Sequence, residues 1–248
     1  MEVLLLRFDA PLLSFGAPIV DNRGVIQPYP ALSMLTGLLG NALGFDHSDT
    51  QPLQRLQERL RYASRQDRQG TRVRDYQTVD LGQDFMRDDH AWTTRGHLEK
   101  RKGGSASTGT HIRLRDYWAD GLHTVALTLD PAEEQPRLKD LETALDRPER
   151  PLFIGRKTCL PSAPLLLGFM QADSLVDALS RAPLPDGADG GGTYTAWWPS
   201  YPGAEEEHAH KRPVTDRRDW ANQIHVGQRW LAFGQIEVNP QEITDDGH

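Results

Sequence analysis

The middle of the chain contains a long segment that is too polar to fold around a core of its own. It runs from about Gly70 to Trp118, and its central stretch, Gly103–Gly109, contains only glycine, serine, threonine and alanine. A segment folds compactly only when it can bury apolar side chains, so we expect this one to project from the body of the protein as an arm. The residues before and after the arm must then build the body together.

Positive charge is concentrated in this arm. Between Trp92 and Arg115 the net charge is +5, whereas the whole chain of 248 residues has a formal net charge of −7. The acidic total argues against a protein coated in positive charge, but a local basic arm attracts phosphate groups. The flanking aromatic residues Trp92, Tyr117 and Trp118 favour contacts with nucleic-acid bases. The alternative is a solvated hairpin whose charge has no role.

The residues on either side of the arm alternate between strand and helix patterns. An apolar run predicts a buried strand over Met1–Asp9, and leucines at helical spacing predict a helix over 32–44, capped by Ser33 and ended by Gly44. Alternating apolar residues predict a half-buried strand at His123–Leu129. The other predicted elements are a helix starting at Pro52, a strand at Tyr62–Asp67, a helix marked by Leu138, Leu141 and Leu145, and a central strand at Pro164–Gln171.

This order predicts an α+β fold with a ferredoxin-like β-α-β-β-α-β palm over residues 1–172, interrupted at about 70–118 by the basic thumb arm. We expect residues 173–248 to form an irregular C-terminal extension packed on the same domain. Its predicted elements are a short helix at Asp173–Arg181, a glycine- and proline-rich connection over Pro183–Tyr201, a charged loop over Glu205–His210 and a strand at Arg229–Val238.

An Arg-Asp-Tyr triplet occurs at each end of the arm, at 74–76 and at 115–117. Cations and aromatic rings at these positions suit contacts with RNA phosphates and bases. The alternative is a pair of hinge strands that contain a buried Arg–Asp pair, and both interpretations can hold together.

A third motif is the run Gly155-Arg156-Lys157 near the end of the predicted palm. Glycine allows the backbone to approach a ligand closely, and two cations follow it directly, which suits an RNA backbone. We expect this run to face Arg113 and Arg115 across a bound strand. The alternative is a plain surface turn.

Composition excludes several classes of protein. Hydrophobic residues make up 38% and charged residues 25% of the chain, a balance typical of globular proteins in water. The apolar runs fall well short of the roughly 20 residues that a membrane helix needs, so we expect no membrane partner and a cytoplasmic location. One cysteine, Cys159, cannot form an internal disulfide and is expected to be a small buried residue.

No motif predicts a cofactor or a catalytic centre. His208 and His210 follow three glutamates and raise the possibility of a metal site, but the run is better interpreted as an acidic loop. We therefore expect no cofactor, no metal and no catalytic residue.

Several of these segments together resemble the CasD family of subunits from type I-E CRISPR surveillance complexes, known as Cascade. The segments are Leu5–Arg7 followed by Ala10–Gly16, the helix from Ser33 to Gly44, Arg74–Val79, and Arg150–Pro164. The resemblance covers most of residues 1–172. It implies a ferredoxin-like RNA-binding protein of the repeat-associated superfamily.

In this family, palm and thumb hold the 5′ handle of the CRISPR RNA, and the subunit contacts the backbone subunits and the large subunit of the complex. The resemblance therefore implies that the subunit contacts target DNA only indirectly, through the complex. The residues predicted to bind RNA are Arg74, Tyr76, Arg95, Lys100, Arg101, Lys102, Arg113, Arg115, Gly155, Arg156 and Lys157.

The alternative function is a metal-independent endoribonuclease that processes CRISPR repeat RNA, as relatives in type I-C systems do. Such an enzyme needs a general base and a group that stabilises the phosphorane, and His97, His111 and Tyr76 are the candidates. Because a separate subunit cleaves the RNA in type I-E systems, the resemblance favours the non-catalytic role.

Overall fold

The structure is a computed structural model that describes residues 1–19, 22–80, 90–92, 98–100, 110–186, 192–204 and 208–241. The fold is mixed α and β, and most of its regular structure is sheet. The helices are α1 (Leu32–Ala42), α2 (Thr50–Arg59), α3 (Leu138–Asp146) and α4 (Leu175–Arg181). None of these described helices has the length and apolar character that crossing a bilayer requires.

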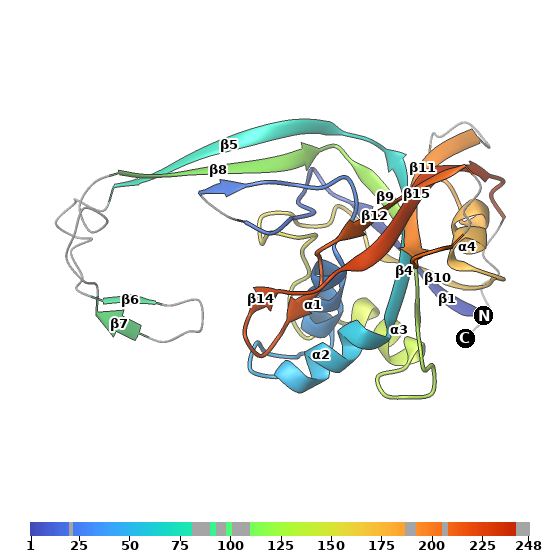
Figure 1. Ribbon diagram of the computed structural model, residues 1–248, viewed down its shortest axis with the longest axis horizontal. Helices are drawn as coiled ribbons and strands as arrows, with labels where there is room; N and C mark the ends of the chain where they lie inside the picture. Colours follow the sequence, from blue (N-terminus) through green and yellow to red (C-terminus); the bar gives the residue numbers. More distant parts are fainter. Residues whose placement is uncertain are drawn as a thin grey trace.

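A seven-stranded antiparallel sheet forms the body, with the strand order β10-β1-β9-β4-β11-β15-β12 (Figure 1). The first four strands in this order are β10 (Leu166–Gln171), β1 (Glu2–Asp9), β9 (Leu122–Leu129) and β4 (Leu60–Arg68). The last third of the chain adds β11 (Gly192–Ser200), β15 (Arg229–Val238) and β12 (Ala209–Val214). Pairing of β11 with β4 makes the sheet continuous.

Both faces of this sheet are covered in its first half. Leu4 and Leu6 of β1 pack in the core that contains α1 and α3, whereas Val3 and Leu5 pack in the core that contains α4. Neighbouring residues of a strand point to opposite faces, so one strand serves both cores. All residues of β9 are buried for the same reason, and the expectation of a half-buried strand at His123–Leu129 is wrong.

The structure confirms the predicted strands at the N-terminus, at Tyr62–Asp67 and at Arg229–Val238, and the helices predicted in the palm and after Asp173. Three other expectations are wrong. The segment Pro164–Gln171 contains β10, which lies at the edge of the sheet and not at its centre. The expected connection over Pro183–Tyr201 contains β11, and the expected loop up to His210 enters β12. Glycine and proline near these segments concealed strands that tertiary pairing stabilises.

The first helix is capped from a distant part of the chain. Its N-cap residue is Ala31, and not Ser33 as expected. The Leu32 N–H donates to the Asp216 carboxylate at 3.1 Å, and the Ser33 N–H donates to the Asp216 carbonyl at 3.0 Å. At the other end, Gly44 adopts a φ of 84° and ends the helix as predicted.

The arm is a two-stranded ribbon that projects from the body (Figure 1). β5 (Thr71–Asp80) pairs with β8 (Thr110–Ala119) along the full length of both strands. Antiparallel pairing satisfies the backbone of a segment that has no core. The short strands β2 (Leu12–Leu13) and β3 (Arg23–Gly24) also pair with β8. The remaining strands are β6 (His90–Trp92) paired with β7 (Leu98–Lys100), and β13 (Arg218–Asp219) paired with β14 (Ile224–His225).

Candidate nucleic-acid interface

The base of the arm presents two different faces. Arg74 is directly opposite Asp116 in the β5–β8 ladder, so both side chains lie on one face. Because side chains alternate along a strand, Tyr76 shares the face of Arg74, whereas Arg113 and Arg115 lie on the other face. The residues predicted to bind RNA are therefore divided between the two faces of the ribbon.

Asp116 organises the first face. Its buried carboxylate accepts hydrogen bonds from Arg72 and from Arg74 Nε, the latter at 2.7 Å, and Arg23 Nε lies 3.9 Å away. The hydrogen bond from Arg74, followed by the one from Arg72, outweighs burial and lowers the pKa of Asp116 to about 2. The side chains of Arg23, Arg72 and Arg74 stay 43–48% exposed, so this face keeps a surplus of positive charge. The predicted Arg–Asp pair between hinge strands is confirmed.

The second face borders a hollow of about 530 Å³. Arg113 and Arg115 of β8 line one part of it, and Arg156 and Lys157 from the loop between α3 and β10 line another. The structure thus brings together the two clusters that were expected to face one another. The described residues of this lining include four cations and no carboxylate, which favours an anionic ligand.

Arg156 also has a structural role in this hollow. Its guanidinium donates to the Asp116 carbonyl at 2.7 Å and to the Gly24 carbonyl at 3.0 Å, and it lies 4.8 Å from the centre of the Tyr117 ring. Arg156 therefore ties its loop to β8 and β3, and part of its hydrogen-bonding capacity is already used. Lys157, the next residue, is exposed.

Gly155 is required by the fold and not by a ligand alone. It adopts a φ of 100°, and a Cβ atom at this position would lie 1.9 Å from the Ser14 carbonyl oxygen. A side chain is excluded here because another part of the backbone occupies its space. This is a structural reason for the glycine, and the expectation that Gly155 also lets RNA approach the backbone stays a prediction.

The other predicted contacts have mixed outcomes. Tyr76 is 60% exposed on the Asp116 face. Tyr117 is buried under Arg156, so the expectation that this ring stacks on a base is wrong. The Trp118 indole N–H donates to the Gln27 carbonyl at 2.8 Å, and the ring is partly exposed, so stacking on Trp118 stays a prediction. Lys100 ends β7. Arg95, Arg101, Lys102, His97 and the tip at Gly103–Gly109 lie outside the described residues.

The candidate catalytic residues within the described part of the arm are not brought together. His111 is opposite Val79 in the ladder and shares the face of Arg113, whereas Tyr76 lies on the reverse face. A general base and a stabilising group must reach the same reacting phosphate. Tyr76 and His111 do not meet this requirement.

Arg23 and its neighbours were missed in the sequence. The segment up to Pro30 looks like a plain loop, but the structure inserts β3 beside β8, where Arg23 approaches Asp116 and Asn22 lines the cationic hollow. The one local feature of the sequence here is the glycine at position 24. The structure explains it, because an added Cβ would lie 2.4 Å from Arg156 Nη2. Sequence spacing contains no information about this parallel pairing.

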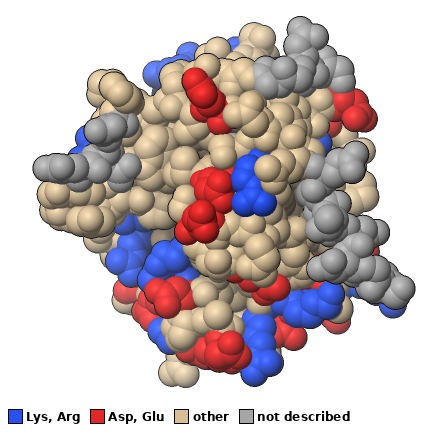
Figure 2. All heavy atoms as spheres, turned by 90° about the vertical axis from the view of Figure 1, so that its right-hand side faces the viewer, with Lys and Arg blue, Asp and Glu red and all other residues tan. Residues whose placement is uncertain are grey.

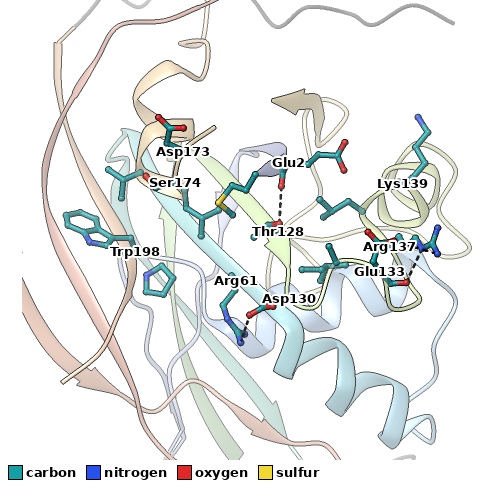
Figure 3. Close-up of a pocket in the computed structure, with 17 residues that line it drawn as sticks. Glu2, Arg61, Thr128, Asp130, Glu133, Arg137, Lys139, Asp173, Ser174 and Trp198 are labelled. Atoms are coloured by element: carbon teal, nitrogen blue, oxygen red, sulfur yellow. Dashed lines mark hydrogen bonds and ion pairs between the residues drawn. The ribbon is translucent and has the colours of Figure 1, made fainter. Parts of the chain in front are cut away.

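Another hollow, of about 770 Å³, is lined by the first residues of β1, the last residues of β9 and the start of α3, at the strand ends away from the arm. Figure 3 shows its lining residues. The lining carries charges of both signs, and two opposite pairs are close: Arg61 lies 3.8 Å from Asp130, and Arg137 lies 3.9 Å from Glu133. Figure 2 shows the side of the molecule that faces right in Figure 1, where acidic and basic residues are intermingled. Neither region gathers cations as the base of the arm does.

Cys159 and the described histidines do not gather into a metal-binding cluster. Cys159 is buried as expected, and burial raises the pKa of its thiol. The His210 ring on β12 lies 5.3 Å from the Phe233 ring. Across the described residues, no group of three or more histidine, cysteine, aspartate or glutamate side chains is placed to hold a metal ion.

Comparisons with known proteins identify relatives along most of the chain. A family profile described as "CRISPR-associated protein (Cas_Cas5)" matches residues 3–232. The protein named "CRISPR system Cascade subunit CasD", from Escherichia coli (strain K12), is 33% identical over 184 residues, which cover 71% of this chain and 75% of that protein.

Two solved structures share the fold at 24% identity. One, titled "CRISPR RNA-guided surveillance complex", has a TM-score of 0.71 and covers 98% of this chain and 95% of its own. The other, titled "Crystal structure of Cas protein", has a TM-score of 0.62 and covers 97% of this chain and 98% of its own.

Proposed function

The chain belongs to the CRISPR-associated Cas5 family, and we propose that it is a non-catalytic subunit of a type I-E CRISPR RNA-guided surveillance complex. In this role it binds the single-stranded 5′ handle of the CRISPR RNA and anchors the neighbouring backbone and large subunits. The name of the E. coli relative, a Cascade subunit, supports membership of such a complex. The location that follows is the cytoplasm, where the RNA is made.

The observation that carries the RNA-binding part is the cationic hollow. Arg113, Arg115 and Lys157 come from two separate segments and line one space without a described carboxylate between them. Phosphate contacts position a nucleic acid and need cations in this arrangement. On a chain with a net charge of −7, such a local gathering favours one site for RNA over binding along the whole surface.

We assign β10, β1, β9 and β4, the first four strands in the sheet order, to a ferredoxin-like palm. The β5–β8 ribbon is then a thumb inserted in this palm. The sheet order β10-β1-β9-β4 and the helices between β1 and β4 and between β9 and β10 support this assignment. The projecting ribbon supplies surface beyond the body (Figure 1), and this supports its use as an anchor for neighbouring subunits.

Binding of handle RNA at different salt concentrations tests the proposal. Lys157→Ala and Arg113→Ala should each weaken binding of the single-stranded repeat RNA and lower the log–log salt slope by about 0.7 per lost phosphate contact. Arg156 is left unchanged because it holds the backbone of β3 and β8 together. The matched control is Arg61→Ala, an exposed arginine at the opposite end of the strands, which should change neither quantity. Unchanged affinity and slope in both test variants would contradict this placement of the RNA.

Incubation with repeat RNA in EDTA tests the absence of catalysis. We expect the RNA to remain intact with the purified protein. Specific cleavage that is lost in a Tyr76→Phe or His111→Ala variant would establish the endoribonuclease instead.

A further inference from the structure

The hollow of about 770 Å³ at the strand ends away from the arm has no part in the RNA contacts proposed above. Its floor is one face of the sheet, because Thr128 and Arg61 are directly opposite each other in the β9–β4 ladder and Trp198 of β11 lies on the same face. The first turn of α4 forms one wall, and the loop between β9 and α3 forms the other (Figure 3). The hollow is thus a part of the sheet that the start of α4 leaves uncovered.

The accessible side chains inside this hollow are largely apolar. Met1 is 51% exposed, and Val176, Trp198 and Pro199 are partly exposed, so an occupant can reach these side chains. Ala132 is exposed at the rim. Tryptophan and methionine are enriched where proteins bind one another, and an apolar centre inside a polar rim is the usual anatomy of such an interface.

The charged groups of the lining leave negative charge without a partner. Arg61 and Arg137 each lie close to a carboxylate, as described above, and Lys139 Nζ lies 2.5 Å from a carboxylate of its own helix. Glu2 and Asp173 are exposed, and neither carboxylate has a cation within 4 Å in the part of the chain that the structure describes. The hollow therefore favours an occupant that brings positive charge beside apolar surface.

Both walls are held in place by hydrogen bonds of their own. The Ser174 side chain accepts from the Asp177 N–H at 3.0 Å and caps α4. In the opposite wall, the Arg137 N–H donates to the Asp140 carboxylate at 2.6 Å. The shape of the hollow is therefore set before an occupant arrives, which reduces the free-energy cost of binding.

Two other occupants fit this hollow less well. The carboxylates of Glu2 and Asp173 repel the phosphates of a nucleic acid. The last residues of the chain, 242–248, include three acidic residues and no lysine or arginine, so they meet the same repulsion. A segment of another protein that combines apolar and basic side chains meets neither objection.

We propose that this hollow is the docking site for a short segment of a partner protein in which an apolar side chain lies beside a lysine or arginine. The apolar side chain contacts Val176, Trp198 and Pro199, and the cation pairs with Glu2 or Asp173. Because the hollow lies at the strand ends away from the arm, this partner and the RNA can be bound at the same time. The inference goes beyond the proposed function, which uses the arm and its base.

The test is a selection of phage-displayed random heptapeptides on the full-length protein, followed by anisotropy measurements with the enriched peptide in fluorescent form. We expect the enriched sequences to combine an aromatic or aliphatic residue with a neighbouring lysine or arginine. Ala132→Trp fills the hollow from its exposed rim and should weaken binding of the peptide by about 10-fold or more. The double variant Glu2→Gln/Asp173→Asn should weaken it by about 3-fold and reduce its salt dependence.

The control variants carry similar changes outside the hollow. Ile224→Trp adds a ring at an exposed position of β14, and Asp120→Asn removes an exposed carboxylate at the base of the arm, so neither should change peptide binding. Ala132→Trp should leave the affinity for the single-stranded repeat RNA unchanged, and this measurement separates failure of the docking site from failure of the proposed function.

Three results overturn the docking site while the proposed function stands. They are a selection without enriched sequences, enrichment of acidic sequences, and peptide binding that is unchanged in both the Ala132→Trp and the carboxylate variants. Displacement of the bound peptide by rU12 would identify the hollow as a nucleic-acid site and would also overturn the inference.

Discussion

Gly155 lies in the lining of the cationic hollow, and its geometry allows a direct test. With a φ of 100° and the Ser14 carbonyl oxygen 1.9 Å from an added Cβ, Gly155→Ala must both strain the backbone and move the Ser14 segment. Backbone strain of this kind costs about 1–3 kcal/mol, and we expect the displacement to bring the loss of unfolding free energy to about 3 kcal/mol or more. Urea denaturation measures this value.

The matched control is Gly203→Ala. Gly203 has a φ of 82°, but nothing lies within 4 Å of an added Cβ. We expect this variant to lose only about 1 kcal/mol from the backbone conformation. Equal losses in the two variants would show that contact with Ser14 is unimportant.

His123 is the residue that should couple folding to pH. It is buried beside Phe15 and Trp197, with ring centres 4.9 Å and 6.2 Å away, and burial lowers its pKa to about 3. The unfolded chain therefore binds one more proton than the folded chain between about pH 6.5 and pH 3, so stability falls as pH falls through this window. The expected slope approaches about 1.4 kcal/mol per pH unit.

Two variants isolate this contribution. Phe and Gln at position 123, in the variants His123→Phe and His123→Gln, cannot titrate. Between pH 6.5 and pH 4, the unfolding free energy of wild type should therefore fall by about 3 kcal/mol more than that of either variant. Denaturation at several pH values gives these curves. Parallel curves for wild type and both variants would mean that His123 is not neutral in the folded state.

At the scale of elements, the start of α1 depends on a residue far away in the sequence. Asp216 caps this helix and also accepts hydrogen bonds from Arg229 Nε and Nη2 at 2.8 and 2.7 Å. Asp216→Asn removes the charge that compensates the largely buried Arg229 and disturbs the cap. We expect a loss of about 3–5 kcal/mol in unfolding free energy.

The control for this prediction is Asp120→Asn. Asp120 pairs with Arg68 at the surface, with 81% of its side chain exposed, and its φ of 57° suits asparagine. Surface pairs of this kind contribute at most about 1 kcal/mol. If Asp216→Asn were as mild as Asp120→Asn, the long-range cap would not support α1.

At the scale of the whole molecule, the sheet makes the first two thirds of the chain dependent on the last third. β11 pairs with β4, and the buried Arg65 of β4 donates to the carbonyls of Ala182 at 3.0 Å and Pro183 at 3.1 Å. A chain that ends at residue 172 lacks these acceptors, and it also lacks α4 over the second core. Arg65 keeps its ion pair with Asp67 in such a chain, but guanidinium N–H groups that lose their carbonyl acceptors and an exposed apolar face both oppose folding.

We therefore expect the 1–172 fragment to show no cooperative urea transition by circular dichroism. Co-expression with the 173–248 fragment should restore the transition. A 1–172 fragment that unfolds cooperatively by itself would show that the C-terminal part is an independent addition to a complete palm.

The sequence by itself determined where β1, β4, β9 and β10 and the four helices form, that the arm projects, and which residues make up the two cationic clusters at its base. It did not determine the burial of β9, the edge position of β10 or the cap of α1. Periodic leucines, alternating apolar residues and a long polar insertion are local signals, because each reflects which surface a segment can bury. The same signals failed for β11 and β12, whose short patterns lie among glycine, proline and charged residues and become strands only by pairing with β15 and, for β11, with β4.

Only the tertiary structure decided how the site residues divide among roles. Ladder register placed Tyr76 and His111 on opposite faces, pairing of β3 with β8 brought Arg23 to Asp116, and the approach of Ser14 explains Gly155. Each of these facts depends on contacts between residues distant in sequence. Spacing along the chain carries no information about such contacts, because they arise when whole elements pack together to bury apolar surface and satisfy buried polar groups.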